Sequence, residues 1–156
     1  MIASQATVRR ARASDAAAVA SLIQRYVPDG TLLPRSPEFI AERAGDFLVA
    51  TLDGRVVGCV HLEEYSPSLA EVRSLAVDPA YHGRGVGAAL ANAVERLARE
   101  REFATLFAVS NNGAFFESRG YAPRDIPELD RERSEVSKFK GVYAKDLGAD
   151  SFAPGP

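Results

Sequence analysis

The sequence is poor in the residues that build redox and metal sites. Its 156 residues include one cysteine, two histidines, one methionine and no tryptophan. A single cysteine excludes an internal disulfide, and the apolar alternating stretch around Cys59 favours a buried structural thiol over a catalytic one. His61 and His82 have no partners at the spacing of metal ligands, so no metal ion is expected.

Long apolar runs and a strong net charge are also missing. No run reaches the roughly 18 residues that a membrane-spanning helix needs, and Met1–Arg10 lacks the pattern of a signal peptide. The formal net charge is −2 and the pI is about 5.7, which gives no general attraction to nucleic acid or membrane. We therefore expect a cytoplasmic protein with a single domain over residues 1–147 and a disordered tail over 148–156.

The order of alternating and helical-period stretches predicts a mixed α/β fold. Strands are expected over 7–13, 47–52, 56–62, 70–77, 105–109 and 138–147. Helices are expected over 17–27, from Ser36-Pro37-Glu38, from Val86 and over 114–119. Asp53-Gly54 between two apolar runs predicts a hairpin with a type I′ turn. The polar stretch 122–135 is expected to be irregular.

Gly83, Gly85 and Gly87 alternate with Arg84 and Val86 at the point where the helix from Val86 is expected to start. The first N–H groups of a helix have no partner within it, and the helix dipole favours an anion there. Glycines let a phosphate approach the backbone closely, although a tight flexible turn also explains them. Ala88-Ala89 stand where a P-loop needs Lys-Ser or Lys-Thr, and a dinucleotide-binding loop would follow the first strand of a βαβ unit.

The stretches EVRSLAVDPAYHGRGVGAALANAVE and FFESRGY resemble the acyl-CoA-binding motif and a second motif of the GCN5-related N-acetyltransferase (GNAT) superfamily. The resemblance implies an acetyl-CoA-dependent N-acetyltransferase. It also implies a mostly antiparallel sheet of about six or seven strands, splayed at the acetyl-CoA site and flanked by about four helices. His82 stands where the family usually has Arg or Gln. The residues that the resemblance assigns to acetyl-CoA are Leu75, Ala76, Val77, His82, Gly83, Arg84, Gly85, Val86, Gly87, Ala88 and Asn111.

Direct acyl transfer needs a neutral amine, and therefore a group that removes a proton. Glu71 matches the position where some members of the family keep a catalytic glutamate. By strand alternation it shares a face with Arg73, and the alternative is a solvated carboxylate paired with that arginine. His61, Glu63 and Glu64 are backups that would act through water.

The proton for the CoA thiolate has no assigned donor. The family often uses a tyrosine at the position of Phe116, which cannot donate. Tyr121 is expected to belong to the core, and Tyr143 is a substitute with little support from the sequence.

LLPRSPE, the segment from Val57 to Gly87, FFESRGYAP and the final KDL resemble the acetyltransferase domain of bacterial N-acetylglutamate synthases. That resemblance implies an α-amino dicarboxylate such as glutamate as acceptor, held by basic side chains. Arg35, Arg73 and Lys138 are the candidates. The synthases have an Arg-Arg-Ser-Lys run where this chain has Lys138-Phe139-Lys140-Gly141.

Two other functions remain open. A catalytically silent acyl-CoA sensor or partner-binding module is compatible with Phe116 and the altered basic run, although Glu71 and the intact glycine loop argue against it. A protein N-acetyltransferase would need an open groove, whereas the proline-rich loop around Arg35 fits closure over a small substrate. Nucleic acid and membrane are not expected as partners, and a homodimer is expected only by analogy with the family.

Overall fold

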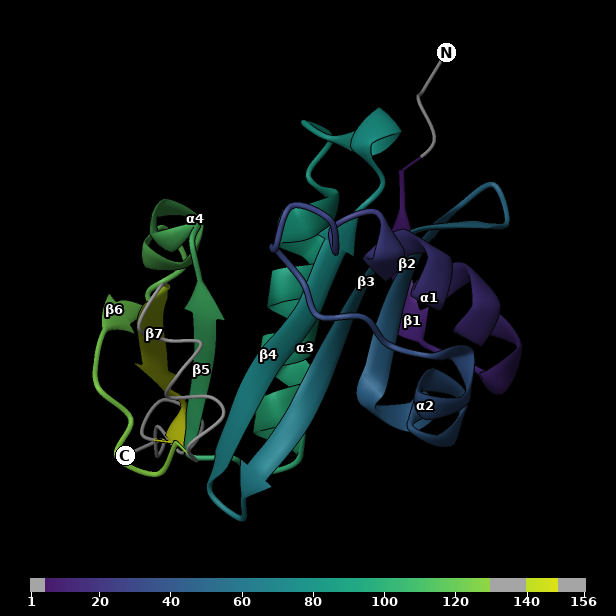
Figure 1. The fold of residues 1–156 in the computed structure, drawn as a ribbon. Helices are drawn as coiled ribbons and strands as arrows, with labels where there is room; N and C mark the ends of the chain where they lie inside the picture. Colours follow the sequence, from purple (N-terminus) through teal and green to yellow (C-terminus); the bar gives the residue numbers. More distant parts are fainter. Residues whose placement is uncertain (1–4, 130–139, 149–156) are drawn as a thin grey trace. The chain divides into compact units, whose positions relative to one another are not determined.

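The computed structural model describes residues 5–129 and 140–148 (Figure 1). The strands are β1 (Thr7–Arg10), β2 (Phe47–Leu52), β3 (Arg55–Ser66), β4 (Leu69–Val77), β5 (Thr105–Ser110), β6 (Ala122–Pro123) and β7 (Gly141–Asp146). The α-helices are α1 (Ala16–Gln24), α2 (Pro37–Glu42), α3 (Val86–Glu100) and α4 (Gly113–Glu117), with 3₁₀ turns at Ala13–Asp15, Ala44–Asp46 and Pro79–Tyr81. The predicted α/β class is confirmed.

The strands form a mostly antiparallel sheet. Their hydrogen-bonded order is β1-β2-β3-β4-β5-β7-β6, with seven strands in the described part of the chain. β1 with β2, β2 with β3, β5 with β7 and β6 with β7 are antiparallel, and β4 with β5 is parallel. This agrees with the mixed sheet expected from the resemblance.

The chain divides into two compact units, which are described separately. Unit 1 comprises residues 1–62 and 74–96, and unit 2 comprises residues 63–73 and 97–156. β3 and β4 each begin in one unit and end in the other. The single domain over 1–147 stays a prediction.

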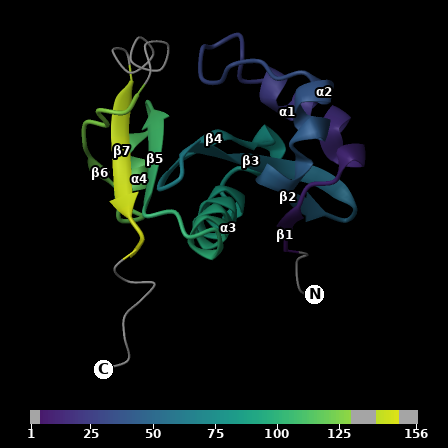
Figure 2. The ribbon, with the colours of Figure 1, turned by 90° about the horizontal axis from the view of Figure 1, so that it is seen from below.

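Unit 1 has helices on both faces of its strands. α1 and α2 lie on one side of β2 and β3, and α3 lies on the other side (Figure 2). The first face is covered by an apolar core whose members include Val19, Ile23, Ile40, Phe47, Val49 and Cys59. Asp53 and Gly54 join β2 to β3 with φ of +50° and +77°, which confirms the predicted type of turn.

The opposite face of β3 approaches α3 closely at Gly58. A Cβ on Gly58 would lie 2.8 Å from Leu90 Cδ1 and 2.9 Å from Val86 Cγ1, so only glycine allows this contact. The helical stripe predicted from the sequence is buried as expected: Val86, Leu90, Val94 and Leu97 are each at most 4% exposed.

Unit 2 is built around β5. Its first three residues pair in parallel with the start of β4, and its whole length pairs antiparallel with β7. Leu69, Phe107, Ile126 and Ala144 form the buried core of this part. Asp146 accepts hydrogen bonds from Arg124 and from the Thr105 hydroxyl, which ties β7 to β5.

Several predicted boundaries were wrong. The first strand ends at Arg10, because Asp15 accepts a hydrogen bond from the Arg12 amide and draws the chain into a 3₁₀ turn. α1 ends at Gln24 and not at Val27, since the next amides bond three residues back and Pro28 disfavours a helical residue before it.

Other differences concern the C-terminal part. β3 continues beyond Leu62 to Ser66, and β6 is a short strand within the stretch expected to be irregular. β7 begins at Gly141. The predicted strand start at Lys138 and the predicted tail from residue 149 onward lie outside the described residues.

Candidate functional site

The glycine loop presents open backbone at the N-terminus of α3. Gly83 and Gly85 have φ of +78° and +79°, and a Cβ on either would meet no atom within 4 Å. The carbonyl of Gly85 accepts a hydrogen bond from the Ala89 amide at 3.0 Å, so the helix starts immediately after this residue. Residues 82–85 are exposed. The loop and the first turn of α3 therefore have backbone of the kind that can bind a phosphate, and the binding itself stays a prediction.

Arg84 adds positive charge to this loop. Its guanidinium lies 5.2 Å from the ring centroid of Tyr81, and its side chain is exposed. An exposed guanidinium with an aromatic neighbour is available for an anion.

The beginning of the loop is bonded to the segment that follows α1. The Tyr26 hydroxyl donates a hydrogen bond to the Val77 carbonyl, and His82 Nε2 lies 3.2 Å from the same carbonyl oxygen and 3.1 Å from the Tyr26 hydroxyl. Arg25 forms an ion pair with Asp78 at 3.2 Å. Burial, and after it the negative charge of Asp78, raises the pKa of the Tyr26 hydroxyl, which therefore stays a donor.

These contacts change the interpretation of two residues assigned to acetyl-CoA. The Val77 carbonyl, expected to be offered to pantetheine, already accepts from two side chains. The resemblance suggested that the His82 side chain lies beside phosphate. In the structure its ring turns back to the end of β4. Leu75 and Ala76 precede this point on β4; Leu75 is partly exposed and the Ala76 side chain is buried.

Glu71 is deeply buried in unit 2. It is 1% exposed and pairs in register with Phe107, the last position at which β4 and β5 are paired. β4 continues beyond this pair to Val77 and β5 to Ser110. The alternative of a solvated carboxylate at a strand end is thus wrong, because Glu71 lies inside the strand and inside the protein.

Arg73 pairs with Glu63 and not with Glu71. Arg73 Nη1 donates to Glu63 Oε1 at 2.8 Å, and the arginine side chain is 14% exposed. The regular alternation that placed Glu71, Arg73 and Leu75 on one face is interrupted, since Ser74 has a φ of +54°. Arg73 is therefore a half-buried cation whose charge is balanced within its own unit.

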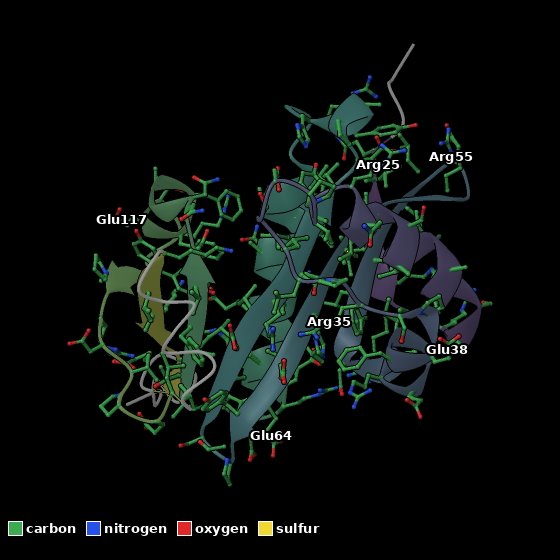
Figure 3. The ribbon with its side chains drawn as sticks, viewed as in Figure 1. Arg25, Arg35, Glu38, Arg55, Glu64 and Glu117 are labelled. Atoms are coloured by element: carbon green, nitrogen blue, oxygen red, sulfur yellow. The ribbon has the colours of Figure 1, made fainter. Side chains whose placement is uncertain are left out.

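Arg35 lies on a stack of aromatic rings in unit 1. Its guanidinium is 4.7 Å from the ring centroid of Phe39, and the Phe39 and His61 rings form a T-shaped pair with centroids 6.0 Å apart. His61 in turn stacks on Phe47 at 4.2 Å and is 2% exposed. In Figure 3 Arg35 lies on the segment that leads to α2, and Glu38 lies on α2 itself.

This stack explains two of the weaker predictions. His61 packs between aromatic rings and is buried, which is the position of a core residue; its role as a base acting through water stays a prediction. Glu63 is held by Arg73, and Glu64 is exposed near the end of β3 (Figure 3). Glu63 and Glu64 lack the burial of Glu71, whereas His61 is buried to nearly the same extent.

The region after β5 holds the remaining candidates of unit 2. Asn111 is exposed, and it is the neighbouring Asn112 that caps α4 by accepting from the Phe115 amide at 3.4 Å. Tyr121 is 5% exposed and packs on Phe116, as expected of a core residue.

The hydroxyl of Tyr143 lies next to Gly113, at the start of α4. The side chain projects from β7 with its ring 6.5 Å from that of Phe116. Only glycine fits at Gly113 and Gly141, because a Cβ on either would overlap the Tyr143 hydroxyl. Tyr143 thus has a defined position in unit 2, and its role as the proton donor to the CoA thiolate stays a prediction.

Cys59 has the structural role expected from the sequence. It is fully buried, and its thiol donates to the Ser74 carbonyl at 3.3 Å. Burial raises the pKa of the thiol to about 12, so it is not a nucleophile at neutral pH.

Three further points complete the comparison with the predicted site. Lys138 lies outside the described residues. Within residues 5–129 and 140–148, no group of three or more histidine, cysteine, aspartate or glutamate side chains is arranged to hold a metal ion. None of the helices in this part of the chain is long and apolar enough to cross a membrane.

Comparison of this chain with known proteins identifies the family to which it belongs. Residues 16–121 match the family model described as "Acetyltransferase (GNAT) family". An uncharacterized N-acetyltransferase of Chlorobaculum tepidum is 37% identical over 78% of this chain and 78% of its own length. An amino-acid acetyltransferase of Mycobacterium tuberculosis is 35% identical over 73% of this chain and 67% of its own length. The chain therefore belongs to the GNAT acetyltransferase family.

A solved structure shows the same fold around coenzyme A. The N-acetylglutamate synthase of Neisseria gonorrhoeae, complexed with coenzyme A and N-acetyl-glutamate, is 26% identical with a TM-score of 0.82. The match covers 94% of this chain and 36% of the synthase chain, so this chain corresponds to about a third of that protein. The protein is an N-acetyltransferase, and its co-substrate is acetyl-CoA.

Sequence reasoning missed two contributors to the site. Tyr26 follows an alanine-rich helix and carries no motif, so only its contact with Val77 reveals it. Phe39, which supports Arg35, lies within α2 and has the ordinary appearance of a core residue. Neither has a local sequence signal.

Proposed function

We propose that this protein transfers the acetyl group of acetyl-CoA to the α-amino group of a small amino acid, with glutamate as the leading acceptor. The observation that carries the proposal is the exposed glycine backbone at the start of α3, combined with a buried glutamate on the strand that leads to it. Relatives named amino-acid acetyltransferase support an amino-acid acceptor.

The pyrophosphate of acetyl-CoA would be held by the glycine loop. The amides of Gly83, Gly85 and the first turn of α3 supply donors, and Arg84 supplies a full positive charge. The pantetheine arm, with its two amides, would pair along the end of β4 like an added strand. Because the Val77 carbonyl already accepts hydrogen bonds, we expect the backbone of Leu75 and Ala76 to pair with the pantetheine arm.

The chemical step would be a direct transfer. Glu71 takes a proton from the ammonium form of the acceptor, and the neutral nitrogen attacks the thioester carbonyl. The N–C bond forms and the nitrogen of the tetrahedral intermediate releases its second proton to solvent. The C–S bond then breaks, and CoA leaves as a thiolate that solvent protonates. A backbone amide of β4 would stabilise the oxyanion that forms between these events.

The acceptor carboxylates require cations. Arg35 has its guanidinium placed over Phe39, 4.7 Å from the ring centroid, which orients the charge. Arg73 is paired with Glu63, so we expect it to bind an acceptor carboxylate more weakly than an unpaired arginine would. Lys138 remains a candidate on the basis of the resemblance alone.

The experiment that tests the acceptor measures CoA release from acetyl-CoA across the free amino acids and simple amines. We expect selective turnover with glutamate or a close relative. Arg35→Ala should raise the KM for that acceptor at least about tenfold, as expected for losing a charged hydrogen bond. Arg43→Ala is the matched control, because the Arg43 guanidinium also lies over Phe39, at 3.8 Å, yet has no proposed role.

Silence across the panel, with acetyl-CoA still bound, would contradict an amino-acid acceptor and favour a protein acceptor. An equal effect of the two arginine variants would contradict the specific role of Arg35.

The role of Glu71 has a separate test. Glu71→Gln keeps the shape of the side chain and removes the base, so kcat should fall by about 10²- to 10⁴-fold while CoA affinity stays unchanged. Retained turnover would remove Glu71 from this role. Loss of CoA affinity as well would show that the variant disturbs the fold of β4.

A further inference from the structure

The segment after α1 is bonded to the exact point where β4 becomes the glycine loop. Val77 is the last residue of β4, and its carbonyl accepts the Tyr26 hydroxyl proton. Arg25, which precedes Tyr26, forms an ion pair at 3.2 Å with Asp78, which follows Val77. Two consecutive side chains from one segment therefore hold two consecutive residues of the other.

His82 closes the turn that starts at Val77. A carbonyl oxygen can only accept, so His82 Nε2 must carry the proton that it shares between the Val77 carbonyl at 3.2 Å and the Tyr26 hydroxyl oxygen at 3.1 Å. The His82 amide also bonds to the Pro79 carbonyl at 3.3 Å. The two ends of the turn, Val77 and His82, are thus joined through Tyr26.

The interior of the turn is bonded as well. The Asp78 carboxylate accepts from the Ala80 amide at 3.0 Å, and the Asp78 carbonyl accepts from the Tyr81 amide at 2.8 Å. The residues with left-handed backbone, Gly83 and Gly85, follow directly after this bonded turn. The open backbone therefore begins where the constraint ends.

We propose that Tyr26 is a positioning residue for acetyl-CoA. It fixes the turn from Val77 to His82, and the turn sets where the Gly83 and Gly85 amides point before the co-substrate arrives. Without the hydroxyl, His82 and Val77 lose their common partner, and binding must order the turn at a cost in affinity. The inference rests on the proposed location of the pyrophosphate at the glycine loop.

A second contact of Tyr26 allows its effect on acetyl-CoA binding to be separated from any effect on acceptor binding. The Tyr26 main-chain carbonyl accepts from the Leu32 amide at 3.0 Å, which supports the segment that leads to Arg35. Tyr26→Phe removes the hydroxyl and keeps this backbone bond. The variant should therefore lower the affinity for acetyl-CoA and leave the affinity for the acceptor unchanged.

The test measures CoA binding by calorimetry in the full chain, with no acceptor present. Tyr26→Phe should weaken CoA binding about three- to tenfold, the range of one lost hydrogen bond. Tyr81→Phe is the matched control, because it makes the same chemical change in the same turn and its hydroxyl bonds to none of the described residues. In steady-state kinetics Tyr26→Phe should raise the KM for acetyl-CoA and leave kcat and the KM for the acceptor unchanged.

A double-mutant cycle tests the shared carbonyl. His82→Ala should also weaken CoA binding, and His82 is exposed, so this variant tests the turn even where Tyr26→Phe fails to fold. In the double variant, the fold-loss of CoA affinity should be clearly smaller than the product of the two single fold-losses, because both side chains act on Val77.

Unchanged CoA affinity in Tyr26→Phe, or fully multiplicative effects in the double variant, would overturn the inference while the proposed function stands. Failure of the unaltered protein to bind CoA would instead overturn the proposed function, and the inference with it.

Discussion

The most informative single substitution is Gly85→Val in the glycine loop. Gly85 has a φ of +79°, where a residue with a side chain is strained by about 1–2 kcal/mol. A Cβ at this position meets no atom within 4 Å, so the substitution causes no clash within the protein itself. Its stability cost is therefore limited to backbone strain. For a chain of this length that strain predicts a fall in Tm of about 2–8 °C.

The effect on acetyl-CoA should be larger than the effect on stability. A branched side chain would occupy the space that a phosphate needs, and the loop would leave the left-handed backbone that aims its amides. A hydrogen bond to a charged group contributes about 1.5–3 kcal/mol, so losing one weakens CoA binding by about 10- to 150-fold.

The matched control is Gly54→Val in the turn between β2 and β3. Gly54 has nearly the same φ, +77°, and a Cβ there also meets nothing within 4 Å. Calorimetry should show a similar fall in Tm for both variants and a loss of CoA affinity in Gly85→Val alone. Equal CoA affinity in Gly85→Val and the unaltered protein would refute the assignment of the loop to pyrophosphate.

Three further predictions concern stability and reactivity. Cys59 should resist alkylation at pH 8 in the native protein and react once the chain is unfolded in denaturant; its raised pKa also predicts that the free energy of unfolding falls between pH 9 and 12, since the unfolded thiol ionises first. Asp15→Asn should lower the free energy of unfolding at pH 7 by about 1–3 kcal/mol in denaturant titrations. The hydrogen bond from Arg9 lowers the pKa of Asp15, so its contribution is present above the usual value of 3.8 and lost as pH falls through the lowered pKa, and the variant should lose less stability on acidification. Gly58→Val should destabilise the fold by at least about 1–3 kcal/mol, because the new side chain overlaps Leu90, and an unchanged Tm would contradict the close packing of β3 on α3.

Local patterns in the sequence predicted the elements that local physics determines. Asp53-Gly54 requires a left-handed turn whatever lies around it, and the structure has that turn. The apolar stripe of α3 has a period that only a helix satisfies, and the helix begins at Val86 as predicted. The glycine loop was predicted for the same reason, since the residues that open the backbone adjoin the helix.

Contacts between distant residues were beyond the reach of those patterns. The burial of Glu71 depends on a parallel pairing with Phe107, which alternation along β4 does not reveal. Arg73 was expected beside Glu71 because alternation places them on one face, but the partner comes from the adjacent strand as Glu63. Tyr26 is the clearest case, because its hydroxyl acquires a role only when the chain brings Val77 to it.

The measurement that tests the central claim most directly follows acetyl-CoA and L-glutamate in one reaction, with CoA release monitored and the product identified by mass spectrometry. The account predicts stoichiometric CoA and N-acetylglutamate, formed by the unaltered protein and reduced at least about a hundredfold in Glu71→Gln. CoA release without an acetylated amino acid, or equal product from the variant, would contradict the proposed transfer.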